Sequence, residues 1–177
     1  MENAVDISGT EAIENQADDE QQYLTFIMAG EEYGVDILAV QEIRGWEETT
    51  MVPNAPPYIK GVINLRGTIV PIMDLRSRFN LEQVEYSPVT VVIILKVETD
   101  RGERVMGIVV DAVSDVHSIA DSETRNRPEL AEDLNSEFIR SLVSVNEKMI
   151  ILLDVKRLLT FEHSQLNLQT NKSSEEE

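Results

Sequence analysis

The two histidines are the first side chains to consider for catalysis or metal binding, because histidine titrates near neutral pH and is a common metal ligand. His117 and His163 lie far apart in the sequence, and neither has a His, Cys or carboxylate at metal-ligand spacing. His117 falls at the end of a predicted strand, where a solvated or hydrogen-bonded histidine is the usual arrangement. The absence of cysteine excludes disulfides and thiolate chemistry and fits a reducing compartment. The sequence therefore predicts neither a metal nor a cofactor.

Carboxylate pairs are the other candidates for chemistry. The pairs at 18–19, 31–32 and 47–48 are adjacent in sequence. Adjacent residues of a strand point to opposite faces, so these pairs are poorly suited to acid–base catalysis. The chain also lacks glycine-rich phosphate loops, a nucleophile elbow and a calcium-binding loop. We therefore predict that the protein is not an enzyme. The alternative is a small β-barrel ligand-binding protein or enzyme whose site has no recognisable motif.

One arginine stands out by its surroundings. Arg66 lies in the otherwise apolar segment 61–75, directly before Gly67, at the tip of a predicted hairpin. Gly67 supplies the positive φ angle that a tight turn favours. The guanidinium therefore projects from a rigid support with a planar set of donors. It either binds a carboxylate or carbonyl of a partner or forms an internal salt bridge with Glu42, which would line an apolar groove.

The elements that position these residues are short strands, predicted from runs of β-branched and aromatic residues between turn residues. We predict strands at 23–28, 33–37, 40–44, 61–65, 68–74, 89–97, 104–111, 142–145 and 149–154, and a short helix at 155–159. Residues 89–97 are expected to be buried on both faces. Pro71 predicts an edge strand or a bulge, and residues 118–134 predict a loop with a weak helix. The pattern is typical of an all-β barrel or sandwich with short helices.

Composition restricts the remaining possibilities. The 177 residues, 42% of them hydrophobic, suit one domain or two small lobes that share a core. No apolar run approaches the length of a membrane span, and the N-terminus has no secretory signal, so we expect a cytoplasmic protein. The net charge of −18 argues against nucleic-acid binding and favours a monomer in isolation. Residues 1–20 are predicted to be a disordered acidic leader and 162–177 a flexible acidic tail, with the folded domain at 21–161.

Four segments carry a family resemblance. They are residues 31–37, 40–45 (Val-Gln-Glu-Ile-Arg-Gly), 59–76 (which contains Asn-Leu-Arg-Gly) and 107–116. In their order and spacing they closely resemble the CheW family of bacterial chemotaxis coupling proteins, and the similarity runs from Tyr23 to Leu159. The resemblance implies two intertwined five-stranded, SH3-like β-barrel subdomains around a groove.

The resemblance also implies a function. CheW-like proteins are adaptors that couple the cytoplasmic tips of transmembrane chemoreceptors to the regulatory domain of the histidine kinase CheA, and so help to build chemosensory arrays. Kinase-specific and receiver regions are absent from this chain, which favours a stand-alone adaptor. Chemotaxis and a related chemosensory pathway are both compatible with the sequence. Carried over by motif, the receptor-binding residues are Val40, Glu42, Ile43, Gly61, Arg66, Val109 and Val110, whereas the kinase-facing residues are not assigned.

Overall fold

Two β-sheets form the molecule in the computed structural model, which describes residues 19–126 and 137–160. The first sheet has the strand order β8-β1-β2-β11-β10-β9. Its strands are β1 (Glu20–Met28), β2 (Glu31–Asp36), β8 (Ala112–Ala120), β9 (Thr124–Asn126), β10 (Ile139–Val145) and β11 (Lys148–Leu153). The second sheet has the order β3-β6-β7-β5-β4. Its strands are β3 (Val40–Gly45), β4 (Ile59–Leu65), β5 (Thr68–Asp74), β6 (Val91–Thr99) and β7 (Gly102–Val110).

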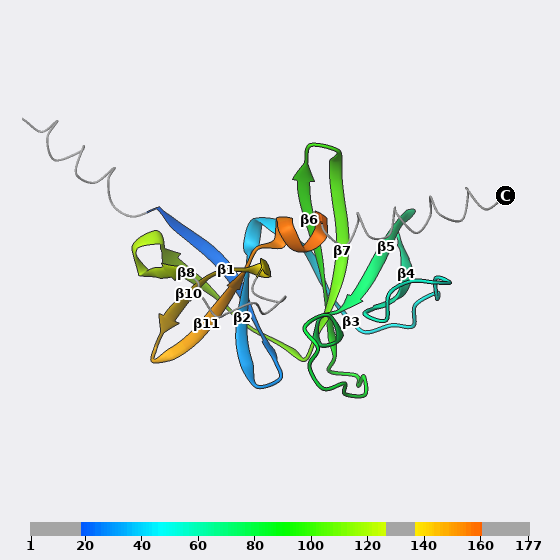
Figure 1. The fold of residues 1–177 in the computed structure, drawn as a ribbon, viewed down its shortest axis with the longest axis horizontal. Helices are drawn as coiled ribbons and strands as arrows, with labels where there is room; N and C mark the ends of the chain where they lie inside the picture. Colours follow the sequence, from blue (N-terminus) through cyan, green and yellow to red (C-terminus); the bar gives the residue numbers. More distant parts are fainter. Residues whose placement is uncertain (1–18, 127–136, 161–177) are drawn as a thin grey trace, which may run out of the picture.

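The chain begins in the first sheet, forms the whole second sheet, and then returns to the first (Figure 1). This path confirms an all-β fold with two lobes. The resemblance implied five strands in each subdomain, and the described residues form six strands in one sheet and five in the other. The additional strand is β9, which pairs with β10 through Ser141–Asn126, Leu142–Arg125 and Val143–Thr124. Neither strand order closes on itself.

The largest hydrophobic core is shared by the two sheets. It contains Phe26 and Met28 from β1, Ile93 from β6, Ile108 from β7 and Leu158 from the last helix. Each sheet also has a smaller cluster of its own. Burial on both faces, predicted for residues 89–97, is confirmed for residues 92–95 of β6, whereas Val89 and Lys96 are exposed. The shared core fixes the two lobes against each other, because separating them would expose these apolar side chains to water.

The proline in β5 does not mark an edge, because β5 lies between β4 and β7. Pro71 stands opposite Val62 of β4. The Val62 N–H donates to the Thr50 carbonyl, and the Val62 carbonyl accepts the Thr50 N–H. The Val62–Pro71 pair is therefore a non-hydrogen-bonded one, and it needs no donor from proline. On the other side, the parallel ladder with β7 starts only at Ile72. The proline thus sits where neither neighbouring strand requires its missing N–H.

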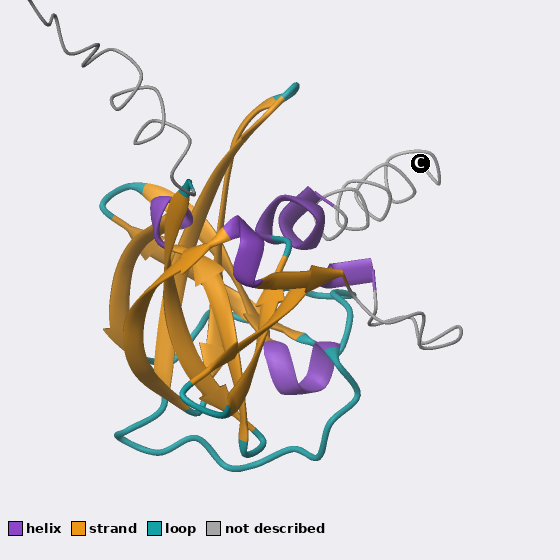
Figure 2. Cartoon of the chain, turned by 90° about the vertical axis from the view of Figure 1, so that its left-hand side faces the viewer, coloured by secondary structure: helices purple, strands orange, loops and turns teal. Residues whose placement is uncertain are grey.

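Short helices connect the strand ends (Figure 2). They are η1 (Ile37–Ala39), α2 (Leu75–Arg78), η2 (Asp121–Glu123) and a helix over residues 155–160. Strands β6 and β7 form a long hairpin that projects from the rest of the molecule (Figure 1). In the predicted loop 118–134, residues up to Ala120 instead complete β8, and residues 127–134 lie outside the described part. The predicted leader reaches β1 only at Glu20; otherwise the leader and the tail lie outside the described residues.

Candidate functional site

The segment that follows β3 reaches β4, the other outer strand of the second sheet, along a contact that we call the seam. The Trp46 N–H donates to the Thr90 carbonyl at 3.0 Å and so extends the pairing of β3 with β6. The chain then reaches β4, where Thr50 exchanges two 2.9 Å hydrogen bonds with Val62. Gly61 makes this approach possible. Its φ is +137°, and a Cβ atom there would lie 2.3 Å from the Thr50 carbonyl oxygen. The seam therefore depends on a residue without a side chain.

An ion pair crosses the seam at its end. Arg66 and Gly67 both have positive φ angles, 49° and 87°, as in the two-residue hairpin turns that match strand twist. This turn directs the Arg66 guanidinium toward β3, where Nη2 donates to Glu42 Oε2 at 2.8 Å. Arg44 Nη1 reaches the other Glu42 oxygen at 3.4 Å. The hydrogen bond from Arg66 is the main reason why the pKa of Glu42 lies below its ordinary value. The internal salt bridge predicted as one of two possibilities is confirmed.

The ion pair is nevertheless available to a partner. The Arg66 side chain is 68% exposed. Within the described chain it makes one hydrogen bond, so its other N–H donors face solvent. Ile43, next to Glu42 on β3, is 47% exposed. Because neighbouring residues of a strand point to opposite faces, Ile43 and the ion pair lie on different faces of β3.

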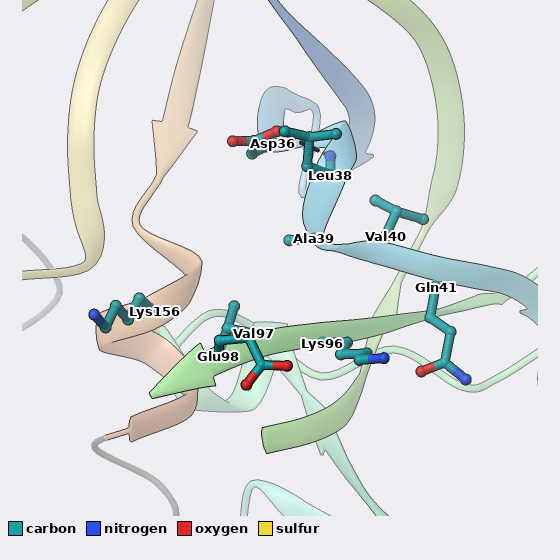
Figure 3. Close-up of a pocket in the computed structure, with 9 residues that line it drawn as sticks. All are labelled: Asp36, Leu38, Ala39, Val40, Gln41, Lys96, Val97, Glu98 and Lys156. Atoms are coloured by element: carbon teal, nitrogen blue, oxygen red, sulfur yellow. Dashed lines mark hydrogen bonds between the residues drawn. The ribbon is translucent and has the colours of Figure 1, made fainter. Parts of the chain in front are cut away.

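A groove lies between the two lobes, close to the start of β3 (Figure 3). Its volume is about 590 Å³, and it is lined by Asp36, Leu38, Ala39, Val40, Gln41, Lys96, Val97, Glu98 and Lys156. Leu38 projects from η1 and is 90% exposed. The carboxylate of Asp36 holds this short helix by accepting the Leu38 N–H at 2.9 Å. Lys96 and Glu98 come from β6, and Lys156 comes from the helix over residues 155–160. The groove therefore combines apolar walls with charges of both signs.

The structure places four of the seven predicted receptor-binding residues on β3 and in the turn between β4 and β5. Val40 lines the groove and Glu42 pairs with Arg66, whereas Ile43 points to the face of β3 opposite to Glu42. Gly61 is buried beneath the seam. Val109 and Val110 are core side chains with 4% and 1% exposure, because β7 lies between β6 and β5. These two valines support the lobe from inside and do not reach its surface.

Sequence reasoning missed several groove residues. Leu38 had a weak signal, since it is an apolar residue directly after a predicted strand. Lys96 and Lys156 had none, because β6 and the last helix meet only in the folded chain. The groove thus depends on contacts between distant segments.

A second arginine–carboxylate pair lies where the two sheets meet. Arg76 of α2 holds Asp111 through two bonds, Nε to Oδ1 at 2.8 Å and Nη2 to Oδ2 at 2.6 Å. Asp111 follows β7, and its Oδ2 also accepts the Ala29 N–H from the β1–β2 turn at 2.9 Å. The hydrogen bond from Arg76 is the main cause that lowers the pKa of Asp111, although burial opposes it. We call this pair the clamp, because it connects elements of both sheets.

The histidines take no part in either feature. His117 lies half-buried within β8, not at its end, and His163 is outside the described residues. Among residues 19–126 and 137–160, no group of three His, Cys, Asp or Glu side chains is arranged to hold a metal ion. In the same residues no helix is long and apolar enough to cross a membrane. What the site offers is a surface for binding: an exposed guanidinium, an exposed isoleucine and a groove with charged rims.

Comparisons with known proteins agree with this architecture. The family model for the CheW-like domain matches residues 22–163. The chain is 49% identical over 146 residues to the chemotaxis protein CheW of Klebsiella aerogenes, covering 82% of this chain and 86% of that protein. Identity to the Bacillus subtilis chemotaxis protein CheW is 32%, with 82% and 90% covered. The crystal structure of the scaffolding protein TtCheW from Thermoanaerobacter tengcongensis superposes with a TM-score of 0.69 at 31% identity, covering 77% of this chain and 90% of that one. The chain therefore belongs to the CheW family of chemotaxis coupling proteins, which are scaffolding adaptors and not enzymes.

Proposed function

We propose that this protein couples the cytoplasmic tips of chemoreceptors to the regulatory domain of the histidine kinase CheA. The receptor contacts the groove and the adjoining end of the seam. The observation that carries this assignment is the Arg66–Glu42 pair, whose arginine is largely exposed. Charged groups held by an internal partner on rigid strands are preorganised, so little conformational entropy is lost when another protein binds them.

The chemistry of the groove suits a helical partner. A helix presents an apolar stripe with polar residues at its margins, and such stripes bind in apolar grooves. Leu38 and Val40 supply the apolar contacts, while Lys96 and Lys156 supply cations for acidic side chains at the rim. Arg66 and Glu42 then set the register of the helix along the groove. Gly61, Val109 and Val110 contribute indirectly, by holding β4 and β7 in place.

The other features of the proposal concern the cellular setting. The protein acts in the cytoplasm and is recruited to receptor arrays through its partners. In isolation it is a monomer, because a net charge of −18 opposes self-association at low salt. Its kinase-binding surface is separate from the receptor face, since an adaptor must hold both partners at once.

The proposal is tested by capturing partners from a lysate of the native host. The baits are the wild-type protein, Arg66→Glu, Glu42→Arg and the charge-swapped double variant. We expect the wild type to retain a chemoreceptor and CheA, and both single variants to lose the receptor while keeping the kinase. If the pair acts only inside the protein, the double variant regains the receptor. If Arg66 contacts the receptor directly, the double variant stays deficient.

A matched control is available at another hairpin tip. Arg101 is an exposed arginine in the turn between β6 and β7, so Arg101→Glu makes the same charge change away from the seam. This variant is expected to retain both partners. Failure of the wild-type protein to retain either partner would overturn the coupling function itself.

A further inference from the structure

The two lobes are built on the same plan. The first sheet runs β8-β1-β2-β11-β10, with β9 added at its edge, and the second sheet runs β3-β6-β7-β5-β4. A parallel pair stands at the same place in each order, β2 with β11 and β7 with β5, and the other neighbours are antiparallel. In Figure 1 the hairpin β1–β2 points down and the hairpin β6–β7 points up. The second half of the chain therefore repeats the fold of the first.

The parallel ladders fix which residues correspond. Leu152 of β11 stands opposite Gly34 of β2, and Ile72 of β5 stands opposite Gly107 of β7. A Cβ atom at Gly34 would lie 2.8 Å from the Leu152 side chain, and one at Gly107 would lie 2.6 Å from the Ile72 side chain. Both sites use a glycine for the same close contact, so Gly34 corresponds to Gly107 and β11 corresponds to β5.

The helices after β11 and β5 extend this correspondence. Asp154 and Asp74 each come two positions after the ladder residue of their strand. Each carboxylate accepts the N–H of the third residue after it, at 3.0 Å for Asp154 and at 3.2 Å for Asp74. The two N-caps start both helices at the same position. Lys156 therefore corresponds to Arg76, the arginine of the clamp.

The groove occupies the place that the clamp occupies in the other half of the chain. Asp111 comes four positions after the glycine of β7, and Leu38 comes four positions after the glycine of β2. The groove residues Lys156 and Leu38 thus correspond to the clamp residues Arg76 and Asp111. The clamp closes one junction between the sheets. At the other junction Leu38 is 90% exposed, and the groove of about 590 Å³ stays open (Figure 3).

The two junctions differ in how their cations are paired. Arg76 binds Asp111 through two hydrogen bonds of 2.8 and 2.6 Å. In the part of the chain that the structure describes, no carboxylate forms a salt bridge with Lys156, although Glu98 lines the same groove. Lys96, the other lysine of the groove, is already paired with an acid of β7 at 2.7 Å. A lysine is a point charge on a flexible stem, which suits a contact that forms and breaks with a partner.

We propose that the groove is the open counterpart of the clamp, and that an acidic side chain of the bound chemoreceptor pairs with Lys156 as Asp111 pairs with Arg76. The receptor helix supplies from outside the carboxylate that the protein's own chain supplies at the other junction. Leu38 packs on the apolar stripe of the same helix, beside this acid. The inference rests on the proposed receptor contact in the groove and adds the kind of side chain that the receptor brings to it.

The correspondence is tested without a receptor by building a second clamp. Leu38→Asp places a carboxylate where Asp111 stands in the other half, and Leu38→Asn is its uncharged control of the same shape. Because Leu38 is exposed, these variants should fold, which circular dichroism checks. We expect Leu38→Asp to have the higher urea midpoint, and this difference to disappear when both are combined with Lys156→Ala, since the new carboxylate then has no cation. An equal difference with and without Lys156→Ala would overturn the correspondence between groove and clamp.

The carboxylate site itself is tested by titration calorimetry with a chemoreceptor tip fragment. Lys156→Glu should lower the affinity by about tenfold or more, because it brings like charges together at the contact. The matched control is Lys148→Glu. Lys148 is exposed on β11 and does not line the groove, so this variant should bind as the wild type does. Leu38→Asp should bind more weakly than Leu38→Asn, because its carboxylate competes for Lys156.

The outcomes separate this inference from the function on which it rests. If Lys156→Glu binds as tightly as the wild type while Arg66→Glu loses the fragment, the carboxylate site is overturned and the receptor contact remains. If the wild-type protein does not bind the fragment, the receptor contact is overturned and this inference falls with it, whatever the urea midpoints show.

Discussion

Two arginine–carboxylate pairs hold this protein together in different ways. The clamp between Arg76 and Asp111 is bidentate, and its side chains are only 14% and 27% exposed. The seam pair between Arg66 and Glu42 has a single 2.8 Å contact, and its arginine is 68% exposed. The clamp also uses a further donor inside the protein, because Arg76 Nη1 donates to the Glu82 carbonyl at 2.8 Å. The seam pair leaves most of its donors in solvent.

This difference separates stability from recognition. A partly buried, bidentate pair is costly to break, since the remaining charge loses its partner in a poorly solvated place. An exposed pair adds little to stability, because water solvates the two charges almost as well as they solvate each other. The same exposure leaves the seam pair free to bind. We therefore expect the clamp to control folding and the seam pair to control partner binding.

The largest effect is expected from breaking the clamp. Asp111→Asn leaves the Arg76 charge without its counterion and should lower the free energy of unfolding by about 2–3 kcal/mol. Urea unfolding followed by circular dichroism measures this loss. A double-mutant cycle with Arg76→Ala serves as the control, and the two single effects should not add. Additive losses would show that the two side chains do not act as a pair.

Acidic pH should weaken the clamp, because the pKa of Asp111 is lowered in the folded protein. Bonding to Arg76 lowers the pKa of Asp111 in the folded state below its value of about 4 in the unfolded chain. The clamp therefore contributes fully above about pH 5 and is lost as the pH falls through the lower, folded-state pKa. We expect the difference in urea midpoint between the wild type and Asp111→Asn to be constant from pH 5 to 7 and to shrink below about pH 4. A difference that grows on acidification would contradict this assignment.

A substitution in the backbone of the seam should lower the stability of the protein strongly. Removal of the seam ion pair should not. Gly61→Ala places a Cβ atom 2.3 Å from the Thr50 carbonyl oxygen at a φ of +137°, so we expect a loss of about 2 kcal/mol or more. Thermal unfolding measures it, with Gly45→Ala as the control. A Cβ atom at Gly45 would have no atom within 4 Å. Equal stability of the two variants would show that the seam opens without cost.

Local sequence patterns predicted much of this site. Strands 61–65 and 68–74 and their turn at Arg66-Gly67 were predicted, because a hairpin depends on residues close in sequence. The Glu42–Arg66 pair was foreseen as one of two possibilities, and the structure confirms it.

What could not be predicted depends on contacts between distant segments. The clamp joins residues 35 positions apart, and no local pattern indicates that α2 and the end of β7 meet. The position of β7 within the sheet was equally hidden, so Val109 and Val110 were assigned to a surface although they lie in the core. Strand β9 was missed because its residues Thr124, Arg125 and Asn126 are polar. They form a strand only through their pairing with β10.

The smallest effect on stability is expected at the exposed ion pair. Arg66→Ala should leave the urea midpoint close to that of the wild type, because the Arg66 guanidinium is largely solvated. The affinity for a chemoreceptor fragment should fall by about tenfold or more, as expected when a charged contact at an interface is removed. Titration calorimetry at low and high salt measures the binding, and the wild-type affinity should weaken as salt screens the contact. A variant that loses stability as much as Asp111→Asn but keeps the receptor would reverse the roles assigned to the two pairs.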